Sequence, residues 1–423
     1  MTAIGVFEGV RVLEIGQYVA APYAAELLSH GGAEVVKVEP LAGDATRYNT
    51  PVGPDEGRQY IVKARGKLGI PIDLGSDVGK NIASELAAAS DVLITNMRPG
   101  AATRLGLDFE TLSGSNPRLV YGEITGFGDD GPLASRPSVD MIAQSWSGLN
   151  MSVGAARDGF PSHHEAFLCD YTAGVLLAFA IAAALRQVAL GNPGQRVSTS
   201  LAHAALVLQH RTANHFEGID DWKTEIDNLV HTEGLSAARD LRERLAADQP
   251  FFFNSYPTSD GVVGIGAVGT MAAQLCDEFG VSDPRTEPEW KQKGNRRRLF
   301  DEARAALARA LATLTSDEIV DRLVARGIPA APFRFVEQAM FDPDARAAGL
   351  IHEWQHPTLG KIVMPAAPVS FSGSHYEAAG ATPALGEHTD EILRRLGYDE
   401  ITIDRLVADG IVWRNTSSGP SEA

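Results

Sequence analysis

The chain has 423 residues, of which 44% are apolar and 22% are charged. This composition supports a large buried core, and the length exceeds the usual size of one domain, so we expect at least two folding units and little disorder. The 54 acidic residues outnumber the 37 basic ones and give a formal net charge of −17, which disfavours a nucleic-acid partner and an anionic membrane surface.

The chain contains two cysteines, Cys169 and Cys276. Two cysteines exclude a multi-disulfide scaffold and a multi-cysteine metal site, and they fit a reducing compartment, so we expect a cytoplasmic protein. Residues 1–10 lack the basic and apolar regions of a secretory signal. The longest apolar run, residues 173–185, is shorter than the roughly 20 residues that span a bilayer, which predicts a buried helix and no membrane partner.

Strand-like and helix-like patterns alternate through the first third of the chain. Residues 10–15 alternate in polarity as a strand does, and residues 34–39 are rich in β-branched valine, which also favours a strand. Residues 22–29 between them carry an Ala/Leu-rich helical pattern. A helix at 79–88 and strands at 91–95 and 119–124 continue the series. Strands that alternate with helices at this spacing predict an α/β fold with a parallel, Rossmann-like sheet.

The alternation stops after a long apolar helix predicted at residues 171–188, which indicates a domain boundary. We predict a large domain from residues 1–205, to which a segment at about 390–423 returns, and a smaller α+β domain at 250–335. Residues 206–249 and 336–389 are interpreted as linkers. Within the smaller domain we expect strands at 251–253 and 261–266 and helices at 271–279, 304–311 and 316–325.

Residues 264–269, with the sequence GIGAVG, match the glycine spacing of a dinucleotide-binding turn. Such a turn needs a second parallel strand that ends in an acidic residue. The polar, turn-like sequence VSDPRTEP at residues 281–288 does not provide that strand. We therefore predict that the motif binds no nucleotide.

His163 and His164 are adjacent, which raises the question of a metal site. Adjacent side chains point to opposite faces of a strand and diverge by about 100° on a helix, so the two rings do not converge on one ion. No further ligand stands at a recognised spacing, and we predict no metal site.

Asp170 directly precedes the predicted apolar helix and has two interpretations. Aspartate is a favoured N-cap residue, so a capping role is the simpler of the two. A carboxylate at a helix N-terminus is also held in its ionised form, as a nucleophile requires. The local sequence leaves both open.

Several separate motifs, in order and over nearly the whole chain, resemble those of the family III (CaiB/BaiF-type) acyl-CoA transferases. They are residues 20–22 (AAP), 32–40 (GAEVVKVEP), 43–44 (GD) with Arg47, 96–100 (NMRPG), 104–107 (RLGL), 116–121 (NPRLVY), 125–128 (TGFG), 136–140 (RPSVD) with Gln144, Asp170 with Ala173 and Gly174, 327–329 (GIP) and 385–389 (LGEHT).

The resemblance implies that Asp170 is the nucleophile. It also implies that acyl-CoA and a carboxylic acid are the substrates, with no permanently bound cofactor, and that CoA moves through an aspartyl anhydride and an aspartyl-CoA thioester. The matching CoA-binding positions are Gln17, Ala20, Asn96, Met97, Ala101 and Arg104. Succinyl-CoA is the first donor to test. The family also implies a homodimer in which each chain threads through a ring made by the other.

The chain departs from the family pattern at Ala21, at Ser198 and in the segment at residues 63–68 (KARGKL), where the family carries an Asn-Arg-Asn-Lys-Arg-Ser-like run. One alternative is an α-methylacyl-CoA racemase or acyl-CoA isomerase of the same fold. Racemases have histidine before Asp140 where this chain has Val139, so His163 or His164 would have to exchange the proton. The other alternative is an inactive CoA-binding protein.

Overall fold

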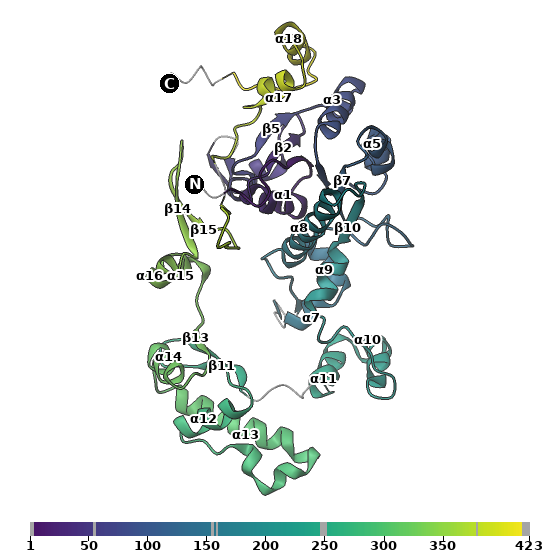
Figure 1. The fold of residues 1–423 in the computed structure, drawn as a ribbon. Coiled ribbons are helices and arrows are strands. Elements are labelled where there is room, and N and C mark those ends of the chain that lie inside the picture. The colour runs from purple at the N-terminus through teal and green to yellow at the C-terminus, as the bar shows by residue number, and fades with distance from the viewer. Residues whose placement is uncertain are drawn as a thin grey trace. The chain divides into compact units, whose positions relative to one another are not determined.

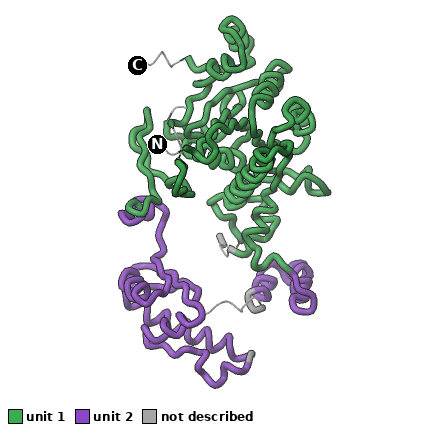
Figure 2. The backbone as a smooth tube through the Cα atoms, viewed as in Figure 1, with its two compact units in different colours: residues 1–214, 346–423 green, residues 215–345 purple. Residues whose placement is uncertain are grey.

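The computed structural model describes residues 4–53, 56–153, 156–157, 160–245, 252–377 and 380–416 (Figure 1). The chain divides into two compact units, Met1–Asn214 with Arg346–Ala423, and His215–Ala345 (Figure 2). The fold is that of an α/β protein with a six-stranded parallel sheet and small antiparallel sheets.

The first unit is built on the parallel sheet, whose strands lie in the order β10-β7-β6-β1-β2-β5. Val12 pairs with Val35 on one side and Val92 on the other, so β1 lies inside the sheet. A parallel sheet is covered on both faces, which explains the short, nearly continuous apolar runs of its central strands. The strands are β1 (Arg11–Ile15), β2 (Glu34–Glu39), β5 (Leu68–Pro71), β6 (Val92–Thr95), β7 (Val120–Thr125) and β10 (Arg196–Ser200).

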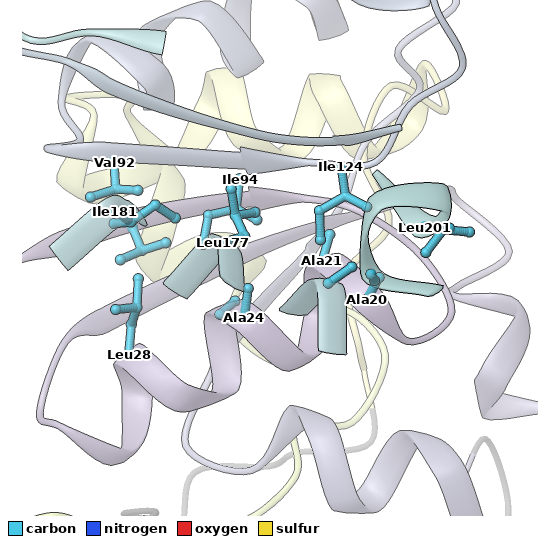
Figure 3. Packing of buried hydrophobic residues seen from close by; sticks show 14 of the residues in the cluster. Ala20, Ala21, Ala24, Leu28, Val92, Ile94, Ile124, Leu177, Ile181 and Leu201 are labelled. Carbon is cyan, nitrogen blue, oxygen red and sulfur yellow. The ribbon is translucent and has the colours of Figure 1, made fainter. Parts of the chain in front are cut away.

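Helices α1 (Ala20–His30), α8 (Leu168–Ala189) and α9 (Leu201–Leu208) contribute to the core on one face of this sheet. Figure 3 shows this packing through Ala20, Ala21, Ala24 and Leu28 of α1, Leu177 and Ile181 of α8, Leu201 of α9, and Val92, Ile94 and Ile124 of the sheet. The other face is covered by α3 (Asp77–Ala88), α5 (Phe109–Ser115), α17 (Thr389–Arg395) and α18 (Glu400–Ala408).

The remaining described elements of this unit are short. They are η1 (Ala45–Arg47), β3 (Pro51–Gly53), β4 (Glu56–Gly57), α2 (Arg58–Ala64), α4 (Ala101–Leu105), α6 (Asp140–Trp146), α7 (Leu149–Val153), β8 (Ala156–Arg157), β9 (Phe160–Pro161), and the hairpin of β14 (Ile351–His356) and β15 (Gly360–Pro365).

Helix α8 extends the apolar run at residues 173–185 to 22 residues. An 18-residue stretch of it has a mean hydropathy of 1.9, which by length and composition alone is enough to cross a membrane. Cys169, Ala173, Leu177 and Ile181 of this helix are buried in the core of the first unit. A core helix of this kind passes the same length test, so the match is weak evidence for a membrane span.

The second unit has an antiparallel sheet of β11 (Phe253–Pro257), β12 (Val262–Gly266) and β13 (Ala330–Pro332), in the order β11-β12-β13. Residues of α12 (Thr270–Glu278), α13 (Lys293–Leu311) and α14 (Ser316–Ala325) form a separate core with it. Its other elements are η2 (Asp221–Thr224), α10 (Glu225–Glu233), α11 (Leu235–Leu245), η3 (Pro284–Thr286), η4 (Pro288–Lys291) and α15 (Val336–Met340), while α16 (Pro343–Ala347) straddles the unit boundary.

The glycine motif at residues 264–269 runs from the end of β12 to the start of α12. Because β12 pairs antiparallel with both neighbours, it does not belong to the parallel βαβ unit that a dinucleotide requires. Two segments are also more structured than their sequences suggest. Residues 206–249, expected to be a linker, contain α10 and α11, and residues 336–389 contain the β14–β15 hairpin. Residues 250 and 251, where the smaller domain was predicted to begin, lie outside the described residues.

Candidate active site

The parallel sheet has a topological switch point between β1 and β6. The chain leaves β1 toward β2 and β5 on one side, and later builds β6, β7 and β10 on the other. Ligands of open α/β sheets bind outside the carboxyl ends of the strands at such a point. Here Gln17 follows β1 and Asn96 follows β6. The Asn96 side chain accepts a hydrogen bond from the Gln17 backbone N–H at 3.0 Å and donates one to the Gln17 carbonyl at 2.9 Å.

A cavity of about 550 Å³ opens at this point. Three of the predicted CoA-binding residues, Gln17, Asn96 and Met97, line it together with the end of β2 and residues 72–74, which follow β5. A volume of this size falls within the usual range of cofactor and small-molecule sites.

The other three predicted CoA-binding residues are placed differently. Ala20 is buried in the first turn of α1. Ala101 and Arg104 lie on the short helix α4, where Arg104 is exposed, and none of these three lines the cavity.

Asp170 is the third residue of α8, which begins at Leu168, with Phe167 at the N-cap in a left-handed conformation (φ 46°). The interpretation of Asp170 as the N-cap is therefore wrong. The cap is supplied from a distant part of the chain, because the Asp140 carboxylate accepts hydrogen bonds from the backbone N–H groups of Cys169 at 2.7 Å and Asp170 at 3.0 Å. Within the described residues the Asp170 carboxylate accepts no hydrogen bond, so its oxygens are available for chemistry.

Asp140 is in turn held by α6, of which it is the first residue. The Gln144 amide donates to its carboxylate, and the same side chain bonds both backbone groups of His164, accepting from the N–H at 2.8 Å and donating to the carbonyl at 3.0 Å. Neither Asp140 nor Gln144 has a predicted role from the sequence, although a spacing of four residues places both on one helical face. Both residues belong to the family-like motif at residues 136–144, so their spacing could have indicated that they act together.

Burial and the nearby Asp140 carboxylate raise the pKa of Asp170 to about 7, and the Lys63 ammonium opposes them. Near neutral pH the group is thus poised between its acid and its nucleophilic carboxylate form. Burial raises the pKa of the neighbouring Cys169 to about 12, and this thiol is fully buried, so Cys169 is not a reactive nucleophile.

Helices α1 and α8 approach closely beside Asp170. A Cβ atom at Gly174 would lie 2.9 Å from the Ala20 carbonyl oxygen and 2.9 Å from the ring of Tyr23. Tyr23 also meets Tyr171 edge to face, with ring centroids 4.8 Å apart. Because Asp170 precedes Gly174 by one helical turn, it lies on the same face of α8, toward the start of α1.

A buried ionic cluster fixes the turn between β1 and α1. Glu14 is fully buried and binds Lys37 at 2.6 Å and Lys67 at 2.7 Å. Lys37 also donates to the Gly16 carbonyl and Lys67 to the Pro22 carbonyl, both at 2.8 Å. The two lysines thus bind the backbone on both sides of the turn that carries Gln17.

The cluster continues beyond Lys37, which also contacts Asp44 at 3.0 Å. The Arg47 guanidinium binds both carboxylate oxygens of Glu39 at 2.7 Å and stacks over the Tyr60 ring at 3.8 Å. Each of these charged groups is therefore compensated, as buried charges must be.

His163 and His164, considered above for metal binding and for proton exchange, are both exposed. Val139, in place of the racemase histidine, is 59% exposed at the N-cap of α6. Among the described residues no group of three or more His, Cys, Asp or Glu side chains is arranged to hold a metal ion.

Comparisons with known proteins indicate the same family as the sequence motifs described above. Residues 7–389 match the model of CoA-transferase family III. Succinyl-CoA:glutarate CoA-transferase from Homo sapiens is 29% identical, with 97% of this chain and 91% of the relative aligned. Formyl-CoA:oxalate CoA-transferase from Streptomyces coelicolor is also 29% identical, over 96% of this chain and 98% of the relative. The crystal structure of Rv3272 from Mycobacterium tuberculosis in an orthorhombic form superimposes with a TM-score of 0.75 at 27% identity, covering 92% and 99% of the two chains.

The parallel sheet, the cavity at its switch point and the full-length match define a CoA-transferring enzyme. The chain belongs to CoA-transferase family III, the CaiB/BaiF family, and its substrates are accordingly acyl-CoA compounds.

Proposed function

We propose that this enzyme transfers CoA from an acyl-CoA donor, with succinyl-CoA the first to test, to a carboxylic acid, and that Asp170 is the nucleophile. The observation that supports this most is the free Asp170 carboxylate, held by the Asp140 cap at the start of α8. The relatives with succinyl-CoA or formyl-CoA in their names are equally distant, so the family alone does not favour either donor.

The reaction follows from what a carboxylate can do to a thioester. An Asp170 oxygen attacks the thioester carbonyl and expels CoA thiolate, which leaves a mixed anhydride. The thiolate then attacks the aspartyl carbonyl and releases the donor acid, giving an aspartyl-CoA thioester. The acceptor carboxylate attacks that thioester, and the expelled thiolate completes the new acyl-CoA and regenerates Asp170. No proton is gained or lost, so water need only be kept away from the activated intermediates.

Replacement of Asp170 tests the proposal. Asp170→Asn and Asp170→Ala are both expected to abolish CoA transfer, since an amide or a methyl group forms no anhydride. Wild-type enzyme treated with acyl-CoA and hydroxylamine should carry a hydroxamate on Asp170, detected by mass spectrometry of the peptide containing Cys169 and Asp170. Full activity in Asp170→Asn would contradict the assignment. Exchange of the α-proton with deuterated water, without transfer, would favour the racemase-type reaction instead.

A further inference from the structure

Lys63 stands out among the buried cations of the first unit. It lies on α2 and is 3% exposed. Lys37, Arg47 and Lys67 beside it all bind acidic side chains. Within the described residues the Lys63 ammonium makes no hydrogen bond and has no ion pair within 4.0 Å. Asp44 lines a small cavity together with Lys63, but its carboxylate lies beyond ion-pair distance, so the Lys63 ammonium can still take a direct anionic ligand.

The surroundings of Lys63 connect it to the candidate site. It lines this small cavity of about 10 Å³ together with Tyr18, Pro22 and Tyr60 and with the charged residues Lys37, Asp44 and Lys67, and this volume suits roughly one oxygen-sized group. Tyr18 also lines the large cavity at the switch point, so a single side chain borders both spaces. Its backbone is left-handed, with φ 67°, and strained residues of this kind cluster at ligand sites.

We propose that Lys63 binds the carboxylate of the acid substrate and holds it beside Asp170, an inference that rests on the function proposed above. The acid and Asp170 are both anions, and they repel each other strongly in a dry site unless a cation lies near them. Consistent with this, Lys63 is the group that lowers the pKa of Asp170 against burial and Asp140. Both the departing and the arriving acid would use the same ammonium.

The protonation of Lys63 sets the pH range of this contact. Burial lowers the pKa of Lys63 to about 8, with Glu26 and Asp44 acting to raise it and Lys67 and Lys37 acting to lower it further. The ammonium is therefore charged at pH 7 and lost as the pH rises through about 8. Binding of the acid should weaken over that range.

The test is the kinetics of Lys63→Met, which keeps the length of the side chain and removes its charge. We expect the KM of the acceptor acid to rise roughly 10- to 100-fold, the range of a lost charge-assisted hydrogen bond, with the KM of acyl-CoA within about twofold of the wild type. The matched control is Lys80→Met, since Lys80 lies on α3 and pairs with the exposed Asp77. It should leave both constants unchanged.

Two further measurements keep the result interpretable. Lys63→Arg, whose guanidinium stays charged, should abolish the rise of the acid KM above pH 8. Removing an unpaired buried charge should not lower the Tm of Lys63→Met, so a kinetic defect would not reflect unfolding. An unchanged acid KM in Lys63→Met would overturn the inference, as would a fall in kcat with both KM values unchanged, which would assign Lys63 to the CoA thiolate. Hydroxamate formation on Asp170 in both proteins would show that the proposed function stands when this inference fails.

Discussion

Asp140 acts on Asp170 in two ways that oppose each other chemically. Its carboxylate caps α8 through the backbone N–H groups of Cys169 and Asp170, which fixes where the nucleophile lies. The same negative charge raises the pKa of Asp170 and reduces the fraction that is ionised. Asp140 thus fixes the position of Asp170 and at the same time lowers the fraction of Asp170 that is ionised. Substitutions of Asp140 can separate the two effects.

Asp140→Asn should keep an oxygen that accepts the capping bonds and remove the charge. The pKa of Asp170 then falls from about 7, because burial alone continues to raise it while Lys63 still lowers it. Since the reactive form is the carboxylate, the acidic limb of the kcat/KM profile for acyl-CoA should move to lower pH. A pH–rate series on both proteins measures this.

Asp140→Ala provides the comparison, because it removes the charge and the cap together. It should show the same shift of the acidic limb and also lose about 0.5–2 kcal/mol of stability, the usual cost of removing a helix cap. Equal acidic limbs in wild type, Asp140→Asn and Asp140→Ala would show that Asp140 does not tune the nucleophile.

Asp170 should also lower the stability of the protein at neutral and alkaline pH. Its pKa is raised in the folded chain from 3.8 to about 7 by burial and then by Asp140, so the folded state favours the protonated acid. Its contribution to stability is full below the unfolded pKa and is lost as the pH rises through about 7. Asp170→Asn, which is neutral throughout, should have a Tm advantage that grows from about pH 4 to pH 7 and then stays constant. A Tm difference that does not change with pH would argue against a raised pKa.

At the scale of secondary-structure elements, the close approach of α1 and α8 positions the site. Gly174→Ala places a Cβ atom 2.9 Å from the Ala20 carbonyl oxygen, a backbone atom that cannot move aside alone. We expect a loss of about 1–3 kcal/mol in the free energy of unfolding, typical of overpacking, and a lower kcat as Asp170 shifts relative to the β1–α1 turn. Denaturant unfolding and steady-state kinetics measure the two effects.

Gly114→Ala is the matched control for this substitution. Gly114 lies in α5, and a Cβ atom there would meet nothing within 4 Å. Alanine should leave activity unchanged and stabilise the helix by roughly 0.5–1 kcal/mol, because glycine is the weaker helix former. If both variants behaved alike, the α1–α8 contact would not be the sensitive feature.

The elements that the sequence predicts well are those whose pattern is local. β2 coincides with the predicted strand at residues 34–39, and α14 with the predicted helix at 316–325. α8 begins three residues before its predicted start because its cap, Asp140, is thirty residues away in sequence. β10 was not predicted, since its sequence RVSTS lies at the edge of the sheet and is largely polar.

The candidate site likewise contains residues that the sequence identifies and residues that only the folded chain identifies. The family resemblance predicted Gln17 and Asn96 as CoA-binding residues, and the sheet topology brings them together after β1 and β6. The sequence could not predict a role for Lys63 in binding an anion. What distinguishes Lys63 is that its ammonium has no direct partner within the described residues. That depends on the positions of the Glu14, Glu39 and Asp44 carboxylates in the folded chain.

At the scale of the whole molecule, we expect a homodimer, as the family resemblance implies. Large apolar side chains on two core helices of the first unit remain exposed in the isolated chain, with Phe179 of α8 at 74% and Val207 of α9 at 52%. Exposed apolar groups of this size are commonly covered by a partner. Light scattering at micromolar concentration should give twice the chain mass of 45.1 kDa. A monomer mass would contradict the expectation.

The helices α17 and α18 cover one face of the parallel sheet with Ile392, Leu393, Ile403 and Leu406, although the strands they cover are complete by residue 200. During synthesis on the ribosome, α3 and α5 can cover part of that face early, but nearly two hundred further residues must follow the last strand before the cover is complete. For that interval a nascent chain leaves exposed the part of the apolar surface that α17 and α18 later cover, and chaperones bind surfaces of this kind. A premature stop before α17 would then be a folding defect even though it removes no residue of the candidate site.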